Sequence, residues 1–227
     1  MRTFPIGGIH PHDNKEWSKD KAIEILELPD EAKIPMIQHI GAPSTPVVQK
    51  GDKVLTGQLI GQATGFVSAN IHSPISGTVT AVDAYPNGQG QRRLMVVIKR
   101  EGDEWVDTID RSPEIKRECT LTPEEIVAKV RDAGIVGLGG AQFPTHVKLS
   151  IPDVQKAEVL IINGVECEPY LTSDYRTMLE RGEMLLVGVE ILMRAVKVER
   201  AVIGVENNKP DAIAHLRDLI AKGNYRG

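Results

Sequence analysis

The stretch TPEEIVAKVRDAGIVGLGGAQFPTHVK, residues 122–148, divides the sequence into two parts with different folding patterns. Its first half predicts a helix, because Thr122 and Glu125 can form a capping box and a proline occupies the first helical position. Apolar residues then recur at helical spacing, and Gly134 is a plausible C-terminal cap. Short strands are predicted before this stretch, and alternating strands and helices after it. The chain is therefore expected to be a multi-domain α/β protein.

The glycine run Gly137–Lys148, GLGGAQFPTHVK, could cradle a phosphate, but it matches neither familiar phosphate loop. A P-loop needs glycine, lysine and a hydroxyl residue in succession, and this order is absent from the sequence. A dinucleotide fingerprint needs a third glycine where Gln142 stands, and a strand rather than a helix before it. Closely spaced glycines still let backbone amides converge on an anion, and Lys148 adds a positive charge. Phe143 could pack against a flat ligand, although a purely structural turn is the alternative.

Residues 34–100 predict a small all-β unit. The runs VVQKGDKVLTGQLIGQATG and ANIHSPISGTVTAVD are short β-branched segments separated by glycine, proline and serine, and LMVVIKR adds one more strand. Residues 1–33 are interpreted as an N-terminal arm and residues 101–120 as a linker.

Residues 121–227 predict an α/β domain. AEVLIINGVE and RAVIGVE are apolar runs that predict buried strands, each followed by a helical pattern, over about 173–196 and 209–221. This order implies a parallel sheet with right-handed crossovers. Because two parallel strands are too few for a stable sheet, either other segments complete it or the chain is a fragment of something longer.

Composition excludes several functions. The chain has 227 residues, a net charge of −4 and 4% aromatic residues, which gives no electrostatic or stacking surface for nucleic acid. Cys119 and Cys167 have no metal-site or disulfide-framework spacing, which favours a reducing compartment. No signal peptide and no membrane-spanning run is predicted.

A second polar cluster follows the first buried strand. Asn163, Glu166 and Glu168 lie at its C-terminal end, where open α/β sheets bind ligands. An asparagine amide suits a flavin or nucleotide edge, and carboxylates can accept hydrogen bonds from ribose hydroxyls. The alternative is a solvated acidic loop.

The β half resembles the biotinyl and lipoyl carrier domains through its Gly-Asp-x-Val turn, a later Gly-Gln and Ser-Pro-x-Ser-Gly-x-Val. In the carriers, a lysine on an exposed hairpin takes the cofactor, and that hairpin aligns with Gly65-Phe66-Val67. Phe66 has no amine to acylate, so a docking or structural barrel-sandwich unit is expected. His10 and His12 could bind a metal ion as an H-x-H pair, but an arm that packs on the domain is the favoured interpretation.

The two clusters together resemble a known family pattern. GLGGAQFPTHVK followed by INGVECEP is similar to the flavin-binding subunit of respiratory complex I. The whole chain is closer to the C subunit of the Rnf ion-translocating electron-transport complex, a resemblance carried in order by GGIHPHDNK, QHIGAPSTPVVQKGDKVLTGQ, HSPISGTVTAV, GIVGLGGAQFPTHVKL, LIINGVECEPYLTSDYR and IGVENNKPDAI.

The resemblance implies a peripheral subunit on the cytoplasmic face of the inner membrane, with the other subunits of the complex as its partners. The complex couples electron transfer between NADH and ferredoxin to ion translocation. This subunit would exchange hydride between NAD(H) and FMN and pass electrons to iron–sulfur clusters. The flavin carries the chemistry, so no side chain is expected to act as an acid or base.

The resemblance also implies roles for individual residues. FMN phosphate and ribityl would be held by Gly137, Gly139, Gly140, Ala141 and Lys148. The flavin would be contacted by Asn163 and Glu166, the nicotinamide nucleotide by Phe143 and Glu168, and the pocket would be lined by Glu206.

Some features depart from the family patterns. Leu138, Gln142 and Val165 replace an arginine, a glycine and an aspartate of the complex I loops, which weakens roles borrowed from that subunit. Family members continue into a segment with two [4Fe–4S] clusters, and two cysteines cannot ligate one cluster. An inactive N-terminal fragment with a truncated α/β domain is therefore expected. The alternatives are a related flavin/iron–sulfur corrinoid reductase or a non-catalytic scaffold domain.

Overall fold

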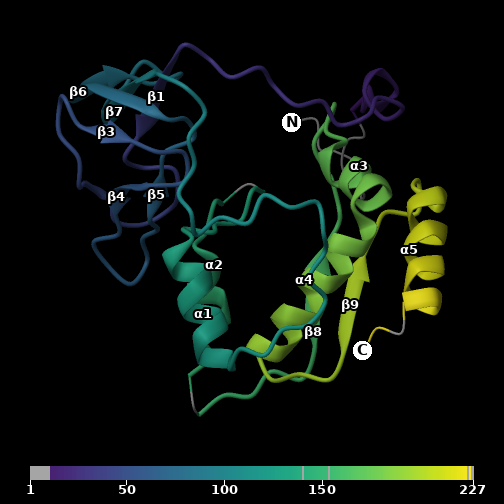
Figure 1. The fold of residues 1–227 in the computed structure, drawn as a ribbon. Coiled ribbons are helices and arrows are strands. Elements are labelled where there is room, and N and C mark those ends of the chain that lie inside the picture. The colour runs from purple at the N-terminus through teal and green to yellow at the C-terminus, as the bar shows by residue number, and fades with distance from the viewer. Residues whose placement is uncertain (1–10, 140, 153, 224, 226–227) are drawn as a thin grey trace, which may run out of the picture. The chain divides into compact units, whose positions relative to one another are not determined.

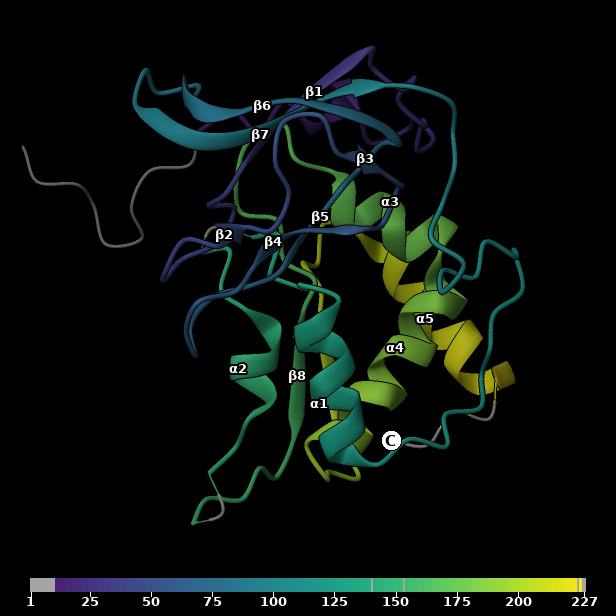
Figure 2. The same ribbon diagram turned by 60° about the vertical axis from the view of Figure 1, so that its left-hand side comes forward.

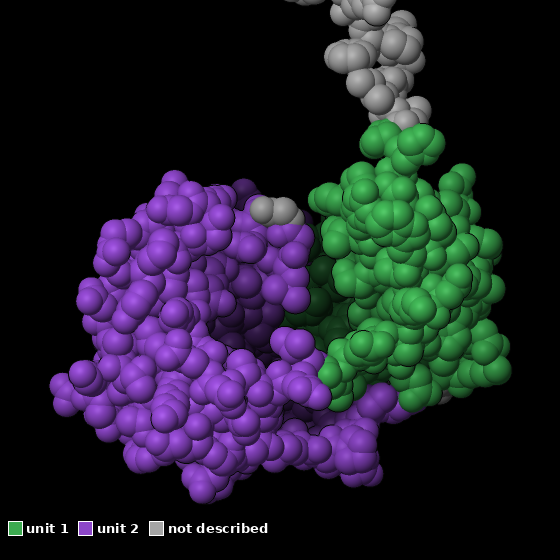
Figure 3. Space-filling view, turned by 90° about the horizontal axis from the view of Figure 1, so that it is seen from above, with its two compact units in different colours: residues 1–25, 157–227 green, residues 26–156 purple. Residues whose placement is uncertain are grey.

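The computed structural model describes residues 11–139, 141–152, 154–223 and 225 (Figure 1). The chain forms two compact units, which Figure 3 colours separately. We call Leu26–Lys156 the barrel unit, and Met1–Ile25 with Ala157–Gly227 the helix–sheet unit. The domain boundaries drawn from the sequence pattern stay predictions.

The barrel unit contains two antiparallel sheets. One has the strand order β1-β7-β6-β3 and the other β2-β4-β5. Their bounds are β1 Glu31–Pro35, β2 Thr45–Pro46, β3 Lys53–Val54, β4 Leu59–Gln62, β5 Ile71–His72, β6 Gly77–Pro86 and β7 Arg92–Arg100. The core between them is aliphatic, and Ile60, Val96 and Ile98 are completely buried. The predicted mixed α/β class with a barrel-sandwich unit is confirmed.

The connection from β4 to β5 includes Gly65-Phe66-Val67, the residues that the resemblance aligns with the lysine hairpin of the carriers. It contains Phe66, whose side chain is 66% exposed. The residue after Phe66 is held by a hydrogen bond from outside the connection, since Ala42 N–H donates to Val67 O at 2.9 Å. A Cβ on Gly41 would lie 2.1 Å from that same oxygen, so only glycine fits there.

Helix α1, Pro123–Asp132, belongs to the barrel unit together with the glycine run and the short helix α2, Thr145–Leu149. The predicted capping box is confirmed, with Glu125 N–H on Thr122 Oγ1 at 3.2 Å and Thr122 N–H on Glu125 Oε2 at 2.7 Å. The predicted cap at Gly134 is also confirmed, with φ +66°. Its Cα lies directly against the β4–β5 connection, since an added Cβ would be 2.1 Å from Asn70 O.

The helix–sheet unit has β8, Leu160–Asn163, and β9, Ala201–Gly204, paired in parallel as predicted. Its helices are α3, Ser173–Glu180, α4, Gly182–Ala195, and α5, Pro210–Gly223, and they cover one face of the sheet (Figures 1 and 2). A short 3-10 helix, η1, Lys15–Trp17, belongs to the same unit. Among the described residues, no helix has both the length and the apolar character to cross a bilayer.

Two predictions for this unit are wrong. The strands are not buried on both faces: Ile161 is 69% and Val202 40% exposed, because the helices cover only the opposite face. The single helix expected over 173–196 is two helices that break at Arg181. Gly182 follows the break and packs closely on α5, since an added Cβ would lie 2.5 Å from Leu219 Cδ1.

Replacing Gly134 by alanine is expected to destabilise the barrel unit by more than about 2 kcal/mol, because a positive φ is costly for alanine and Cβ overlaps Asn70 O. Gly51 is the matched control. It also has a positive φ, of +98°, but nothing lies within 4 Å of an added Cβ. Gly51→Ala should therefore cost only the backbone term, about 1–2 kcal/mol.

The chain has two tryptophans, so Trp105 fluorescence in a Trp17→Phe background reports the barrel unit during urea unfolding. Equal losses of stability in the two glycine variants would show that the contact with Asn70 is unimportant.

Candidate functional site

The glycine loop is a closed turn within the barrel unit. Val136 pairs with Pro144 in an isolated antiparallel bridge, and Thr145 N–H donates to Ile135 O at 2.9 Å, so the two ends of the loop meet. Gly137 N–H donates to Phe143 O at 3.0 Å, which means that this amide is used inside the loop. Gln142, where the dinucleotide pattern has glycine, takes a positive φ of +48°.

Lys148 lies over the glycine loop. Its ammonium nitrogen would be only 2.9 Å from a Cβ built on Gly137, although the side chain is otherwise exposed. Gly139 has open space beside its Cα, with nothing within 4 Å of an added Cβ. A cation beside open backbone is the arrangement that suits a phosphate group.

The barrel supports the loop through two contacts that the sequence did not reveal. Ile40 N–H donates to Gln142 O at 3.3 Å. His146, on α2, is buried and its Nε2 lies 3.1 Å from Phe66 O. The Phe66 and His146 rings meet edge to face, with centroids 6.3 Å apart. The loop, α2 and the β4–β5 connection thus form one continuous structure.

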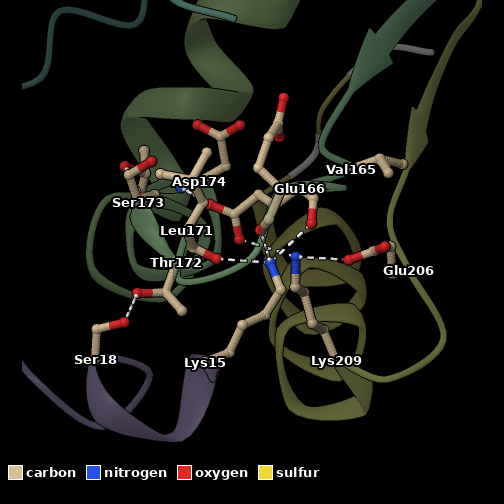
Figure 4. Close-up of polar contacts among 12 residues, drawn as sticks. Lys15, Ser18, Val165, Glu166, Leu171, Thr172, Ser173, Asp174, Glu206 and Lys209 are labelled. Carbon is tan, nitrogen blue, oxygen red and sulfur yellow. Dashed lines mark hydrogen bonds and ion pairs between the residues drawn. The ribbon is translucent and has the colours of Figure 1, made fainter. Parts of the chain in front are cut away.

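The acidic loop, residues 164–171, follows β8 in the helix–sheet unit. The carboxylate of Glu166 in this loop faces inward (Figure 4). Glu166 is 3% exposed. Its Oε1 accepts the Asp174 N–H at the start of α3 at 2.6 Å, and its Oε2 lies 2.9 Å from Lys209 Nζ, immediately before α5. The carboxylate therefore caps a helix N-terminus, where the helix dipole favours negative charge.

Lys209 holds two carboxylates in this buried cluster. Its Nζ is 3.1 Å from Glu206 Oε2 as well as bound to Glu166. Burial alone would raise the pKa of Glu166, but the hydrogen bonds from Lys209 and the Asp174 amide outweigh it and lower that pKa. Burial likewise opposes the charged form of Lys209, yet its bonds to Glu166 and Glu206 raise its pKa. Both groups are therefore charged at neutral pH.

Lys15, on η1, reaches the backbone of the acidic loop (Figure 4). Its Nζ donates to Glu166 O at 2.7 Å, Glu168 O at 3.2 Å and Leu171 O at 2.7 Å. An ammonium group has three protons, so its donors match the three carbonyls. Neither Lys15 nor Lys209 was predicted as a site residue.

The predicted site residues fall into two groups. Gly137, Gly139, Ala141, Phe143 and Lys148 lie in the barrel unit, and Gly140 lies outside the described residues. The helix–sheet unit brings Glu166 and Glu206 together on Lys209, while Asn163 and Glu168 are exposed. Asn163 Oδ1 accepts the Val165 N–H at 3.2 Å, which shapes the start of the loop. In the part of the chain that the structure describes, no group of three or more acidic, His or Cys side chains could hold a metal ion.

Glu166→Gln is expected to lower the free energy of unfolding of the helix–sheet unit by about 3 kcal/mol at pH 7, because it removes one of the two carboxylates that balance the buried Lys209 charge and leaves only Glu206. A carboxylate with a depressed folded-state pKa stabilises above its unfolded value, here 4.5, and this stabilisation is lost as the pH falls through the folded value. The difference between wild type and variant should therefore shrink below pH 4.5.

Trp17 fluorescence in a Trp105→Phe background measures this unfolding. Glu168→Gln is the control, since this side chain is exposed and its loss should change stability by less than about 0.5 kcal/mol. A pH-independent deficit in Glu166→Gln would contradict the ion-pair account.

Comparison with known proteins identifies both parts of the chain. The RnfC barrel sandwich hybrid domain matches residues 3–103, and the Nuo51 FMN-binding domain matches residues 130–227. The C subunit of the proton-translocating ferredoxin:NAD(+) oxidoreductase complex of Clostridium ljungdahlii is 49% identical over 93% of this chain and 46% of the relative. The C subunit of the Na(+)-translocating complex of Acetobacterium woodii is 47% identical over 92% of the chain and 47% of the relative.

A more distant relative, the C subunit of the ion-translocating oxidoreductase complex of Pseudomonas aeruginosa, is 39% identical over 100% of the chain but only 29% of its own length. The chain thus spans about half the length of the first two relatives and less of the third. With one segment that matches the RnfC barrel sandwich hybrid domain and a second that matches a Nuo51 FMN-binding domain, the chain is similar to RnfC subunits over almost its whole length.

Proposed function

We propose that the chain is the FMN- and NAD(H)-binding part of a subunit of an ion-translocating ferredoxin:NAD(+) oxidoreductase complex. The observation that carries the proposal is the Lys148 ammonium beside Gly137, in a segment that matches an FMN-binding domain. The names of the relatives supply the reaction, which is electron transfer between NADH and ferredoxin coupled to ion translocation.

The glycine loop would bind the phosphate and ribityl end of FMN. Lys148, whose ammonium group lies beside Gly137, supplies the positive charge, and the open backbone at Gly139 lets phosphate oxygens approach closely. Gly140 and Ala141 would contribute backbone contacts, and Phe143 would pack against the nicotinamide nucleotide.

The acidic loop would present polar groups to the flavin and the nicotinamide nucleotide. Asn163 and Glu168 have exposed side chains that can make such contacts. Glu166 and Glu206 are bound to Lys209 inside the unit, so we assign them to holding the loop rather than to direct flavin contact. This assignment revises the role that the resemblance implied for Glu166.

FMN, when bound, supplies hydride exchange with NAD(H) and one-electron release toward iron–sulfur clusters. The protein residues bind and orient the two nucleotides. Lys148 balances phosphate charge, and Asn163 can both donate and accept hydrogen bonds. Glu168 can accept hydrogen bonds from hydroxyl or amide groups. No side chain is assigned as a proton donor or acceptor, since hydride transfer requires none.

We further propose a peripheral position on the cytoplasmic face of the membrane, with the other subunits of the complex as partners and ferredoxin as an indirect one. Electrons leaving FMN would pass to two [4Fe–4S] clusters outside these 227 residues. The barrel, whose hairpin carries Phe66 in place of a lysine, would dock or support rather than carry a group.

Lys148→Ala is expected to weaken FMN binding by about 10- to 100-fold, since a hydrogen bond to a charged group contributes about 1.5–3 kcal/mol. The protein expressed from its complete gene should bind flavin and lose its visible flavin band on anaerobic addition of NADH. Titration of the apoprotein with FMN, followed by flavin fluorescence, gives the affinity.

Lys156→Ala is the matched control, because Lys156 is an exposed lysine of the same unit and should leave FMN affinity unchanged. A wild-type protein that binds no flavin, or whose flavin NADH leaves oxidised, would overturn the proposed function.

A further inference from the structure

We propose that the N-terminal segment Asp13–Ile23 is a built-in part of the nucleotide site, with Lys15 as the residue that positions the acidic loop. The inference rests on the proposed function, because it assigns a role in NADH use to the loop that Lys15 holds. It goes beyond that function by adding a segment distant in sequence, since Lys15 is 151 residues from Glu166.

The acidic loop needs an external hydrogen-bond donor because it is irregular. Its carbonyls at Glu166, Glu168 and Leu171 all converge on Lys15 Nζ, at 2.7, 3.2 and 2.7 Å. A flexible ammonium group can satisfy three carbonyls that point toward one place, whereas a regular strand or helix would satisfy them separately. The positions of the three peptide groups are therefore fixed relative to one another by a single side chain.

The segment also holds the most strained residue of the loop. Tyr170 has a positive φ of +68°, which is unfavourable for a residue with a bulky side chain. Its N–H donates to Asp13 O at 2.6 Å, and its carbonyl accepts the Ser18 hydroxyl at 3.2 Å. Its ring packs on Trp17, with centroids 5.5 Å apart. The segment thus satisfies both backbone groups of Tyr170 and contacts one side of its ring, which stays 53% exposed.

Further contacts fasten the segment along α3. Ser18 Oγ accepts the Thr172 hydroxyl at 2.9 Å, just before the helix begins. Arg176 donates to Lys19 O at 3.0 Å, and both oxygens of Glu180 accept the Ile23 N–H at 3.1 Å. The contacts span the segment from Asp13 to Ile23, so it has a defined position on the unit rather than a single point of attachment.

Two cations therefore hold the acidic loop in different ways. Lys209 binds the Glu166 side chain, and Lys15 binds the backbone on both sides of Cys167. With its inner side occupied, the loop leaves Asn163 and Glu168 exposed. The carbonyl of Glu168 is one of the groups that Lys15 binds, so Lys15 helps to position the peptide group from which the exposed Glu168 side chain extends.

The test is Lys15→Met in the protein expressed from its complete gene, which removes the donors and keeps the length of the side chain. We expect the KM for NADH to rise about tenfold, with a smaller change in kcat, because displacement of a substrate-contacting group weakens substrate positioning. FMN content should stay the same, since Lys15 binds the carbonyls of Glu166, Glu168 and Leu171, and neither the glycine loop nor Asn163 is altered. Amide hydrogen exchange should become faster in residues 164–171.

Two further variants separate positioning from general damage. Lys15→Arg keeps charged donors and should recover at least half of the lost affinity for NADH. Lys21→Met removes an exposed lysine of the same segment and should behave as wild type.

Wild-type protein with no NADH-dependent loss of the flavin band would overturn the proposed function, and this inference with it. An active wild type with an unchanged KM in Lys15→Met would overturn the inference alone, even if hydrogen exchange became faster, because the segment would then have only a structural role.

Discussion

The buried ion pair between Glu166 and Lys209 joins three elements of the helix–sheet unit. Its two charged atoms are 2.9 Å apart, and the same carboxylate accepts the Asp174 N–H at the start of α3. Two charges removed from water are costly unless each has several partners. Glu166 is bound by Lys209 and the Asp174 amide, and Lys209 is bound by Glu166 and Glu206. Because the β8 loop, α3 and the residue before α5 all meet at this pair, the loop cannot shift without leaving a charge unpaired.

A related constraint, the need of backbone carbonyls for hydrogen-bond donors, accounts for the contacts of Lys15. A loop that leaves a strand and turns toward a helix has carbonyl groups with no partners in either element. Lys209 satisfies a side chain but not this backbone, and Lys15 supplies donors for three of its carbonyls. The loop is thus held by one cation at its carboxylate and another at its peptide groups.

Features determined by local chemistry were predictable from the sequence. The capping box at Thr122, the glycine cap at Gly134 and the parallel pairing of β8 with β9 each depend on residues close together in the chain or on a repeating pattern. The break at Arg181 was missed because it depends on how closely Gly182 packs on α5. The burial of the strands was overestimated because an apolar run does not reveal how many faces the helices cover.

The candidate site was only partly predictable for the same reason. The glycine run and the acidic cluster are visible as residue types at short spacing. The contacts of Lys15 with Glu166 and of His146 with Phe66 join residues 151 and 80 positions apart, and nothing in the sequence pairs them. Lys209 gave a weak signal, since it lies three residues after Glu206 and directly before the proline that starts α5.

Because Glu166 points inward, it holds the acidic loop in place and does not face a ligand, although it belongs to the same sequence motif as the exposed Asn163 and Glu168. A carboxylate that is 3% exposed and bound by an ammonium group and an amide has no free direction in which to meet a flavin. Its effect on a ligand must then pass through the loop that it holds. Asn163 and Glu168 are exposed and belong to the same short segment, so a ligand would meet them first. Under the proposed function, stability of the loop and recognition of the ligand therefore depend on different side chains, although all three belong to one motif.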